Sequence, residues 1–488
     1  MPRTATTRDR TATAPVLIVL VLGFSSMCAA LMQSLVIPLQ PELPRLLSTD
    51  PSSAAWVVTA TLLAGGVAMP VAGRLADIRG RKPVLVTSAL ILLAGSLVCA
   101  LSSSIVPVLI GRILQGLAMG YIPVAISFVR ETVPASMQNS SVAGISATLG
   151  VGGALGLPLA AWIAQDYNWH VLFWVSAGLA AVMALLSVVV LPHRPPVDES
   201  RLDTVGAIGL AVGVVAVLGG ISKGGDWGWG SPSTLGAIIG GIAVLLAWGF
   251  YETRHPHPLV DLRTTARRPI LLTNIAALLI GFGMMAQSIV VPQLLQLPEA
   301  TGYGMGQTIL QAGLWMAPAG LMMLAFTPVS SLMLTRFGAR VTLAVGAVVI
   351  AAGYLSAAAF AAEPWQLLVS TCIASAGVGI GYAAMPTLIL QNSPATEAGA
   401  GVGVNALMRS MGTTIAGAVM ALVLTSRMTQ LGDGLSIPAE EMFHLCFLLG
   451  AGAAITGALV VLCIPRTPAI SPVAAAHPAQ ADEPTPVR

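Results

Sequence analysis

Glutamine, serine and proline interrupt two apolar segments of this sequence at matching places. Residues 33–38 read QSLVIP and residues 287–292 read QSIVVP, each within a long run of apolar side chains. A polar amide in such a run can face a water-filled cavity, or it can hydrogen-bond to a neighbouring helix for about 1 kcal/mol. The first interpretation makes both glutamines binding residues for a small molecule. The candidate cavity residues are Met32, Gln33, Ser34, Gln287, Ser288 and Asn405.

Two arginines also lie inside apolar segments. Arg112 shares one helical face with Gln115, three residues further on, and Arg409 follows Asn405 by four residues. A charge at such a depth costs a few kcal/mol, so both side chains should face the interior of a helix bundle. Arg112 is then either a functional cation or a structural one paired with backbone carbonyls. Asn405 and Arg409 either line the cavity or serve helix packing.

The composition defines the setting of these residues. The chain of 488 residues is 56% hydrophobic and 9% charged, whereas soluble domains carry about 25% charged residues. We therefore expect a membrane protein with many spans. Its net charge of +3 is too small to indicate a nucleic-acid partner, and the five cysteines lack the spacing of a metal site or disulfide framework. Phosphate-loop and zinc-protease motifs are also absent, so we expect no enzyme activity, metal or cofactor.

Fourteen apolar runs are long enough to cross a bilayer, which takes about 20 helical residues each. Lys and Arg concentrate in alternate loops, which predicts that both termini are cytoplasmic. Residues 1–14 form the cytoplasmic N-terminus, and residues 465–488, rich in Pro and Ala, read as a disordered cytoplasmic tail. The expected spans are 15–38, 55–75, 84–102, 107–128, 141–163, 171–191, 204–221, 233–251, 269–293, 308–331, 341–361, 366–389, 401–425 and 442–464.

Three pairs of similar segments indicate an internal duplication. Each pair alone is weak, but all three occur in the same order at nearly constant spacing. In the second pair Thr335 takes the place of Asp77. The pairs are QSLVIP with QSIVVP, PVAGRLADIRGRK (70–82) with PVSSLMLTRFGAR (328–340), and Gly120-Tyr121 with Gly381-Tyr382.

The duplication predicts two six-helix bundles, residues 15–191 and 269–464. Because an even number of crossings separates them, the bundles should be parallel repeats with the substrate site between them. Segment 192–268 is then a linker that carries an inserted helix pair, 204–221 and 233–251.

Several motifs resemble those of the major facilitator superfamily. GRLADIRGRK (73–82) is similar to the signature between family helices 2 and 3, and GRILQGLAMG (111–120) is similar to the helix-4 motif. GVGGALGLP (150–158) resembles the motif of the family's antiporters, although Ala160 and Ala161 replace a frequent closing glycine pair. Fourteen spans, together with SKGGDWGWGS and HPLVDLR in segment 192–268, point to the fourteen-helix drug:proton antiporters.

The resemblance covers residues 15–464. It implies an all-α major facilitator fold of two parallel six-helix repeats plus an inserted pair, working as a monomer in the bacterial cytoplasmic membrane. It further implies a secondary active transporter that exports hydrophobic drugs, antibiotics or dyes in exchange for protons. The alternative is an importer or facilitator of a small metabolite. The partners would be hydrophobic small molecules, protons and the lipid bilayer.

The loop motif at 73–82 has a physical sense of its own. Gly73 permits close helix approach and Gly80 a tight turn. Asp77 can accept hydrogen bonds from a helix N-terminus in the other half when the cytoplasmic gate is shut, which is how the family uses it as a latch. Arg81 and Glu131 can complete a charge relay with it. The second copy lacks this aspartate, so the latch should be one-sided.

The predicted span 141–163 contains Gly152, Gly156 and Pro158. These residues should give a bendable, closely packed helix at the interface between the halves. The family interpretation is prevention of leak during exchange, and the alternative is ordinary packing of small residues.

Proton-coupling residues are harder to place, because many fourteen-helix relatives carry an aspartate in helix 1 where this chain has Met32. The resemblance assigns Arg112 to proton coupling. Glu42 and Glu131 are the carboxylates nearest to a proton path. If Glu42 belongs to an extended first helix, burial would raise its pKa into a useful range. A cavity with amides and methionines but no central carboxylate suits bulky, apolar or neutral compounds better than dications.

Overall fold

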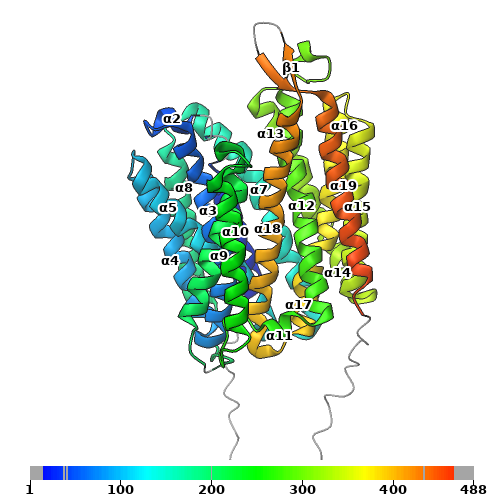
Figure 1. Ribbon diagram of the computed structural model, residues 1–488. Coiled ribbons are helices and arrows are strands. Elements are labelled where there is room, and N and C mark those ends of the chain that lie inside the picture. Colours follow the sequence, from blue (N-terminus) through cyan, green and yellow to red (C-terminus); the bar gives the residue numbers. More distant parts are fainter. Residues whose placement is uncertain (1–14, 37–38, 40–41, 199, 432–434, 466–488) are drawn as a thin grey trace, which may run out of the picture.

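The computed structural model describes residues 15–36, 39, 42–198, 200–431 and 435–465 (Figure 1). Predictions for residues 1–14, for the tail from residue 466 and for Pro38 fall outside these residues. Within them, fourteen helical segments are long and apolar enough to cross a membrane. The predicted all-α polytopic fold is thereby confirmed, and the chain is a multi-pass membrane protein.

The helical elements are α1 (Pro15–Ser34), α2 (Leu43–Leu46), α3 (Pro51–Arg79), α4 (Arg81–Ala100), α5 (Ile105–Leu117), η2 (Ala118–Gly120), α6 (Tyr121–Thr132), α7 (Ala135–Asp166), α8 (His170–Val190), α9 (Thr204–Trp227), α10 (Pro232–Glu252), α11 (Leu262–Thr265), α12 (Arg268–Gln296), η3 (Glu299–Thr301), α13 (Ile309–Ala325), α14 (Thr327–Arg336), α15 (Gly338–Ala359), α16 (Pro364–Gly381), α17 (Ala384–Asn392), η4 (Ala395–Glu397), α18 (Ala398–Ser426) and α19 (Glu440–Leu462).

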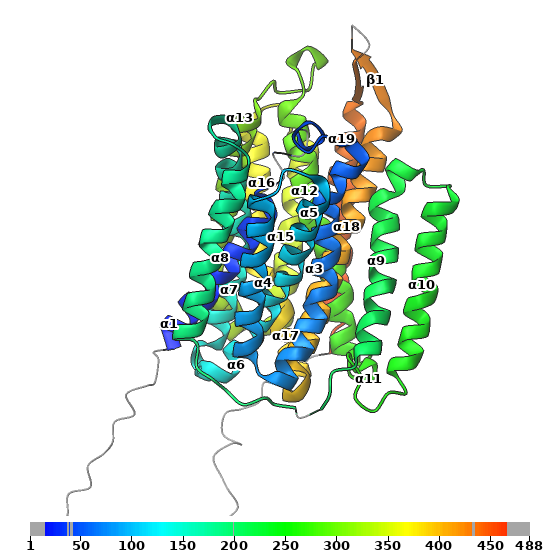
Figure 2. The ribbon, with the colours of Figure 1, turned by 90° about the vertical axis from the view of Figure 1, so that its left-hand side faces the viewer.

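Helices α1 to α8 form one bundle, the N-half, and α12 to α19 form a second, the C-half (Figure 1). The halves meet along two seams, where α3 packs against α18 and α7 packs against α13 and α14. Helices α9 and α10 pack against each other at the edge of the molecule, and α9 contacts both α3 and α18 (Figure 2). The inserted pair therefore covers the α3–α18 seam.

Both halves break their fourth span at the repeated Gly-Tyr pair. In the N-half, α5 gives way to the short helix η2, and α6 begins at Tyr121. In the C-half, α16 ends at Gly381 and α17 begins at Ala384. Glycine weakens a helix interior because it has the greatest backbone freedom to lose on folding. The same two residues thus mark the same interruption in each bundle.

Several element boundaries differ from those predicted. Helix α1 ends at Ser34 instead of residue 38, and α9 continues to Trp227 instead of residue 221. The longer α9 buries Lys223, which is tolerated because its ammonium group donates to Asp226 at 2.8 Å and to the Ser52 carbonyl at 3.1 Å. Antiparallel strands β1 (Met428–Leu431) and β2 (Leu435–Pro438), with Thr429 opposite Ile437, were not predicted at all.

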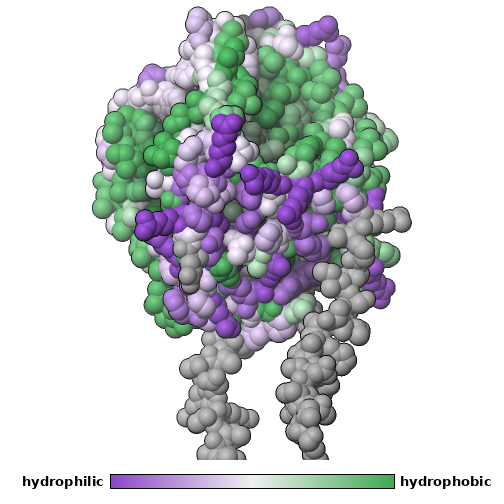
Figure 3. Space-filling view, turned by 60° about the horizontal axis from the view of Figure 1, so that its bottom comes forward, coloured by the Kyte–Doolittle hydropathy of each residue, from purple (hydrophilic) through white to green (hydrophobic). Residues whose placement is uncertain are grey.

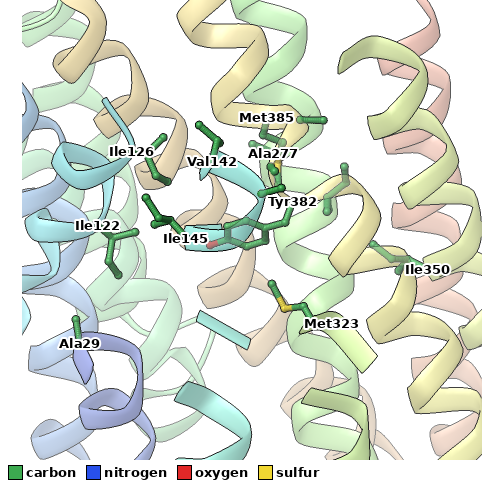
Figure 4. Close-up of a cluster of buried hydrophobic side chains, with 14 of the residues drawn as sticks. Ala29, Ile122, Ile126, Val142, Ile145, Ala277, Met323, Ile350, Tyr382 and Met385 are labelled. Carbon is green, nitrogen blue, oxygen red and sulfur yellow. The ribbon is translucent and has the colours of Figure 1, made fainter. Parts of the chain in front are cut away.

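The two ends of the molecule are named here after their connecting segments. The linker end carries residues 192–198 and 200–203 of the linker, and the strand end carries β1 and β2 (Figure 1). Hydrophilic side chains gather on the face of the linker end, while the flanks are mainly hydrophobic (Figure 3). Apolar side chains from both halves fill the space between the bundles, where Tyr382 points toward Ile145 (Figure 4). Apolar side chains therefore form much of the contact between the bundles.

Candidate gate and transport pathway

A buried carboxylate joins the two halves at the linker end. Asp77, near the end of α3, is 0% exposed, and its two oxygens accept hydrogen bonds from the backbone amides of Gly399 and Ala400, both at 3.0 Å. These amides belong to the first turn of α18, where the helix presents unpaired N–H groups and the positive end of its dipole. The arrangement is an anion held by a helix N-terminus.

Glycines allow the two helices to come close enough for this contact. A methyl group on Gly73 would collide with the backbone carbonyl of Gly399, and one on Gly399 would collide with that of Gly73. One turn further along, a methyl on Gly403 would meet the backbone of Met69 and Pro70. Helices α3 and α18 therefore touch backbone to backbone. Gly80 has a φ of 90° at the turn between α3 and α4, a conformation that favours glycine.

Arg81 connects the Asp77 carboxylate to a second acid in the same half. Its guanidinium lies 3.1 Å from the Asp77 carboxylate, contacts Glu131 of α6 and donates to the Ser127 hydroxyl at 3.2 Å. Arg81 is only 2% exposed, so its charge is balanced almost entirely by these acids. In the second copy, Thr335 is exposed and its hydroxyl bonds to the carbonyl of Ser331 in its own helix.

The linker adds contacts to this cluster that no sequence motif indicated. The backbone carbonyl of Asp77 accepts from the amides of Val197 and Asp198, both at 3.1 Å. Arg74 forms an ion pair with Asp198 at 2.9 Å and also donates to the carbonyl of Thr396 in the C-half, at 3.4 Å. Partial burial opposes ionisation of Asp198, yet hydrogen bonds from Ser200 and the Arg74 guanidinium hold the pKa of this carboxyl below its usual range.

A cavity of about 190 Å³ lies beside these contacts at the linker end. Its walls come from the N-half, the linker, the segment between α10 and α12, and the first turns of α18. Its polar residues include Arg74, Asp198, Asp261, Thr264 and Glu397. Arg74, Asp198, Thr396 and Ala400, which take part in the contacts described above, thus also line a polar space between the halves.

The first helix of the N-half meets the fourth span of the same half through Gln33. A cavity of about 10 Å³, the size of one water molecule, is lined by Met32, Gln33, Thr61, Arg112 and Gln115, among others. Arg112 is 1% exposed and donates to the backbone carbonyl of Val57 at 3.0 Å and to the Gln115 amide oxygen at 2.7 Å. No described carboxylate pairs with it, so its partners are those of the structural interpretation.

The C-half repeats this arrangement with different partners. The Gln287 amide donates to the hydroxyl of Ser375 on α16 at 3.4 Å, and its backbone N–H donates to the hydroxyl of Tyr354 at 2.8 Å. Both glutamines are half-buried, and Ser34 is as well, whereas Ser288 is exposed. In each half the glutamine of the first helix therefore faces the fourth span.

Two predicted positions need correction. Asn405 is 1% exposed, and its amide donates to Asn274 on α12 at 3.0 Å, so its described partner is the one that the helix-packing interpretation predicts. Glu42 lies outside α1 in an exposed turn, where it pairs with Arg45 at 2.8 Å. The burial on which its proton-coupling role depended is missing, because α1 ends eight residues earlier.

Arg409 lies in the middle of α18, with its guanidinium 4.5 Å from the ring centre of Tyr382. The side chain is half-buried, and no carboxylate of the described chain pairs with it. Stacking on an aromatic ring stabilises a partly exposed cation by about 1 kcal/mol. A positive charge is therefore present between the halves near the Tyr382 ring seen in Figure 4.

Helix α7 uses its glycines on two sides. Methyl groups on Gly152 and Gly156 would collide with α1 of the same half, at Met27 and Ser34 respectively. Only Gly150 faces the other half, against Met323 of α13. Pro158 lies inside the helix, which continues to Asp166. Gly152 and Gly156 therefore allow close packing within the N-half, whereas Gly150 makes the contact between the halves.

Comparisons with known proteins agree with this architecture. The sequence profile of the Major Facilitator Superfamily matches residues 22–206 and 273–487. The chain is 25% identical to the tetracenomycin C resistance and export protein of Streptomyces glaucescens, over 85% of this chain and 76% of that protein. It is 28% identical to the multidrug resistance protein B homolog of Mycobacterium tuberculosis H37Rv, over 76% of this chain and 69% of the relative.

Solved structures show the same fold at lower identity. The human organic anion transporter MFSD10 superposes with a TM-score of 0.65 at 15% identity, over 92% of this chain and 99% of that one. The proton:xylose symporter XylE superposes with a TM-score of 0.63 at 15% identity, over 93% and 97% of the two chains.

Proposed function

The chain belongs to the major facilitator superfamily, and we propose that it exports hydrophobic small molecules in exchange for protons by alternating access between its two halves. Membership of this family makes it a membrane transporter. Export is supported by the names of relatives, which include a tetracenomycin C resistance and export protein and a multidrug resistance protein. Drugs, antibiotics or dyes are the proposed substrates.

The observation that carries this proposal is the contact of Asp77 with the Gly399 and Ala400 amides. It joins opposite halves at the linker end, and the equivalent residue of the C-half at this same end, Thr335, makes no comparable contact in the described chain. A bond that closes one end of the central pathway is what alternating access requires. We assign this end to the cytoplasm, since basic residues concentrate in its loops. The conformation is then open, or ready to open, toward the outside.

The polar groups of the interface favour neutral or acidic hydrophobic compounds. Gln33 and Gln287 offer amides at equivalent places, and Arg409 adds a positive charge that is stacked on Tyr382. None of the twenty acids lies in the middle of a described span. Because like charges repel strongly in a desolvated site, organic dications should be poor substrates.

For proton coupling we propose Glu131 and Arg112. Glu131 reaches the gate through Arg81, so a proton on Glu131 would weaken its hold on Arg81 and alter the charge balance around Asp77. Arg112 lies beside the water-sized cavity that also contains Gln33, which places a fixed charge next to the proposed binding site. Glu42 is withdrawn from this role because it is exposed.

Uptake into inverted membrane vesicles tests the proposal. An imposed proton gradient with an acidic vesicle lumen should drive the accumulation of fluorescent hydrophobic dyes. Neutral, anionic and monocationic dyes are compared. Asp77→Asn and Gln33→Ala should each reduce accumulation, while Thr335→Ala should leave it unchanged. Flux that is independent of the gradient, or restricted to small polar metabolites, would favour the importer or facilitator instead.

A further inference from the structure

Two acids meet at the base of the inserted helix pair, outside the gate described above. Asp203 directly precedes α9, and Glu252 is the last residue of α10, so both lie at the linker end. They are 6% and 2% exposed. A methyl group on Gly206 would collide with one carboxyl oxygen of each acid at once. The two carboxyl groups are therefore close neighbours on either side of that glycine.

One oxygen of each acid is bound and the other is free. Asp203 Oδ1 accepts from the Gly206 amide at 2.8 Å and from the Tyr251 hydroxyl at 3.2 Å. Glu252 Oε2 accepts from the amide of Val260 at 3.4 Å. The remaining oxygens, Asp203 Oδ2 and Glu252 Oε1, are buried and accept no hydrogen bond from any described residue. Both free oxygens are the ones that face Gly206.

Positive charge near this pair is scarce. His255 comes closest, with Nδ1 at 3.8 Å from Asp203 Oδ2. Arg263, in the following segment, donates to the carbonyl of Thr253 instead. The indole N–H of Trp248, one turn before Glu252 on α10, is buried and lies near the Glu252 carboxyl group, but its geometry there is not that of a hydrogen bond. Neither acid has a Lys or Arg partner among the described residues.

His255 Nδ1 accepts from the backbone amide of His257 at 3.2 Å, so this nitrogen carries no proton toward Asp203. Two adjacent buried carboxylates without a Lys or Arg partner do not both remain ionised, because desolvation and mutual repulsion add up. We propose that Asp203 and Glu252 share one proton and form a proton-binding site at the base of the inserted pair. The shared proton allows one of the two free oxygens, Asp203 Oδ2 or Glu252 Oε1, to donate a hydrogen bond to the other. Both oxygens then have a hydrogen-bond partner. Such a pair binds and releases its proton as a unit.

The site connects two segments that both reach the gate. Asp203 ends the linker whose amides at Val197 and Asp198 hold the backbone of Asp77. Glu252 holds Val260, which lines the 190 Å³ cavity together with Arg74 and Ala400. Loss of the proton would leave two negative charges side by side and push the segments apart. The inserted pair would thus loosen the linker end at high pH and secure it at low pH.

The proton site does not depend on the transported substrate, whereas its effect on flux rests on the proposed function. Infrared spectroscopy of the purified full-length protein in D₂O tests the site without any substrate. The carbonyl band of a protonated carboxyl group should be present at neutral pH in the wild type and lost in Glu252→Gln. The asparagine of Asp203→Asn can still cap α9. In this variant the band should disappear at a pH at least about one unit lower than in the wild type, which corresponds to a tenfold weaker proton affinity.

The matched control is Glu299→Gln, which alters an exposed acid at the strand end and should leave the band unchanged. A Glu252→Gln spectrum identical to the wild type would overturn the proposal. So would an Asp203→Asn band that titrates at the wild-type pH, since the two acids would then be independent. Both substitutions are close to isosteric, and size-exclusion chromatography identifies any variant that fails to fold.

Cysteine labelling tests the connection to the gate. In a background without native cysteines, Val260→Cys should react faster with a water-soluble maleimide as the pH rises. His257→Cys, which is exposed, supplies the reference for the intrinsic pH dependence of the thiol. The labelling rate of Val260→Cys divided by that of His257→Cys should rise with pH when Asp203 and Glu252 are both present. The same ratio should stay constant with pH in the Glu252→Gln background. A ratio that stays constant with pH when both acids are present would refute the opening of the segment around Val260.

Discussion

A carboxylate suits the position of Asp77 better than any neutral side chain. It offers two acceptors to two adjacent amides at the N-terminus of α18, and its charge complements both the helix dipole and Arg81. An asparagine has one acceptor oxygen and would leave an amide and part of the arginine's charge unpaired. Sequence reasoning could identify this aspartate because a lone acid among four cations is conspicuous. It could not find Asp198, whose partner Arg74 is distant in sequence.

Asp77→Asn should therefore weaken the contact between the halves. Hydrogen bonds to charged groups contribute about 1.5–3 kcal/mol each, so loss of one such bond should shift the equilibrium at least tenfold away from the closed linker end. We expect dye accumulation in inverted vesicles to fall by about the same factor. Thr335→Ala, at the matching place in the other half, is the control. Wild-type accumulation by Asp77→Asn would contradict the role given to this contact.

Arg409 should set the charge preference of the transporter. Arg409→Gln removes the positive charge beside Tyr382 and should improve efflux of monocationic dyes at the expense of anionic ones. Arg409→Lys keeps the charge but loses the planar stacking, so it should retain the preference with lower affinity. Competition between a cationic and an anionic dye of similar size measures this ratio. An unchanged ratio in Arg409→Gln would place the charge outside the substrate path.

At the scale of elements, hydrophobic runs predicted all fourteen spans, whereas the break at each Gly-Tyr pair was not predicted, because the two pairs were interpreted only as markers of the repeat. Boundaries were predicted less well, because partners distant in sequence decide them. The end of α9 at Trp227 depends on the Ser52 carbonyl, which accepts from buried Lys223. Strands β1 and β2 consist of four residues each and pair only with each other, a pattern too short to recognise beforehand.

Close packing of α3 on α18 should be sensitive to a single methyl group. Gly73→Ala forces the Gly399 carbonyl to move, at a cost of about 1–3 kcal/mol, and should impair transport while the protein still folds. Gly240→Ala is the matched control, since nothing lies within 4 Å of its added methyl group. Thermal unfolding in detergent, together with vesicle transport, separates the two effects. Transport by Gly73→Ala at the wild-type rate would argue against a tight seam.

At the scale of the whole molecule, the two halves are helical bundles joined at the linker end by polar contacts. The α3–α18 seam is closed at the linker end by Asp77, Arg74 and the linker, and the inserted pair spans the outside of this seam. Because the halves are related by duplication, the sequence predicted the arrangement of the bundles. The linker contacts and the acid pair under the inserted helices could not be foreseen, since each joins residues from segments with no shared motif.

Reciprocal movement of the two ends is the central claim, and double electron–electron resonance tests it most directly. One pair of spin labels at Arg79 and Ala395 reports on the linker end, and another at Ser103 and Glu363 reports on the strand end; all four side chains are exposed. Compared with the labelled wild type under the same conditions, Asp77→Asn should lengthen the distance between the labels at the linker end and shorten the distance between those at the strand end. Distances that stay constant at both ends, or that lengthen together, would contradict two halves rocking about a shared central pathway.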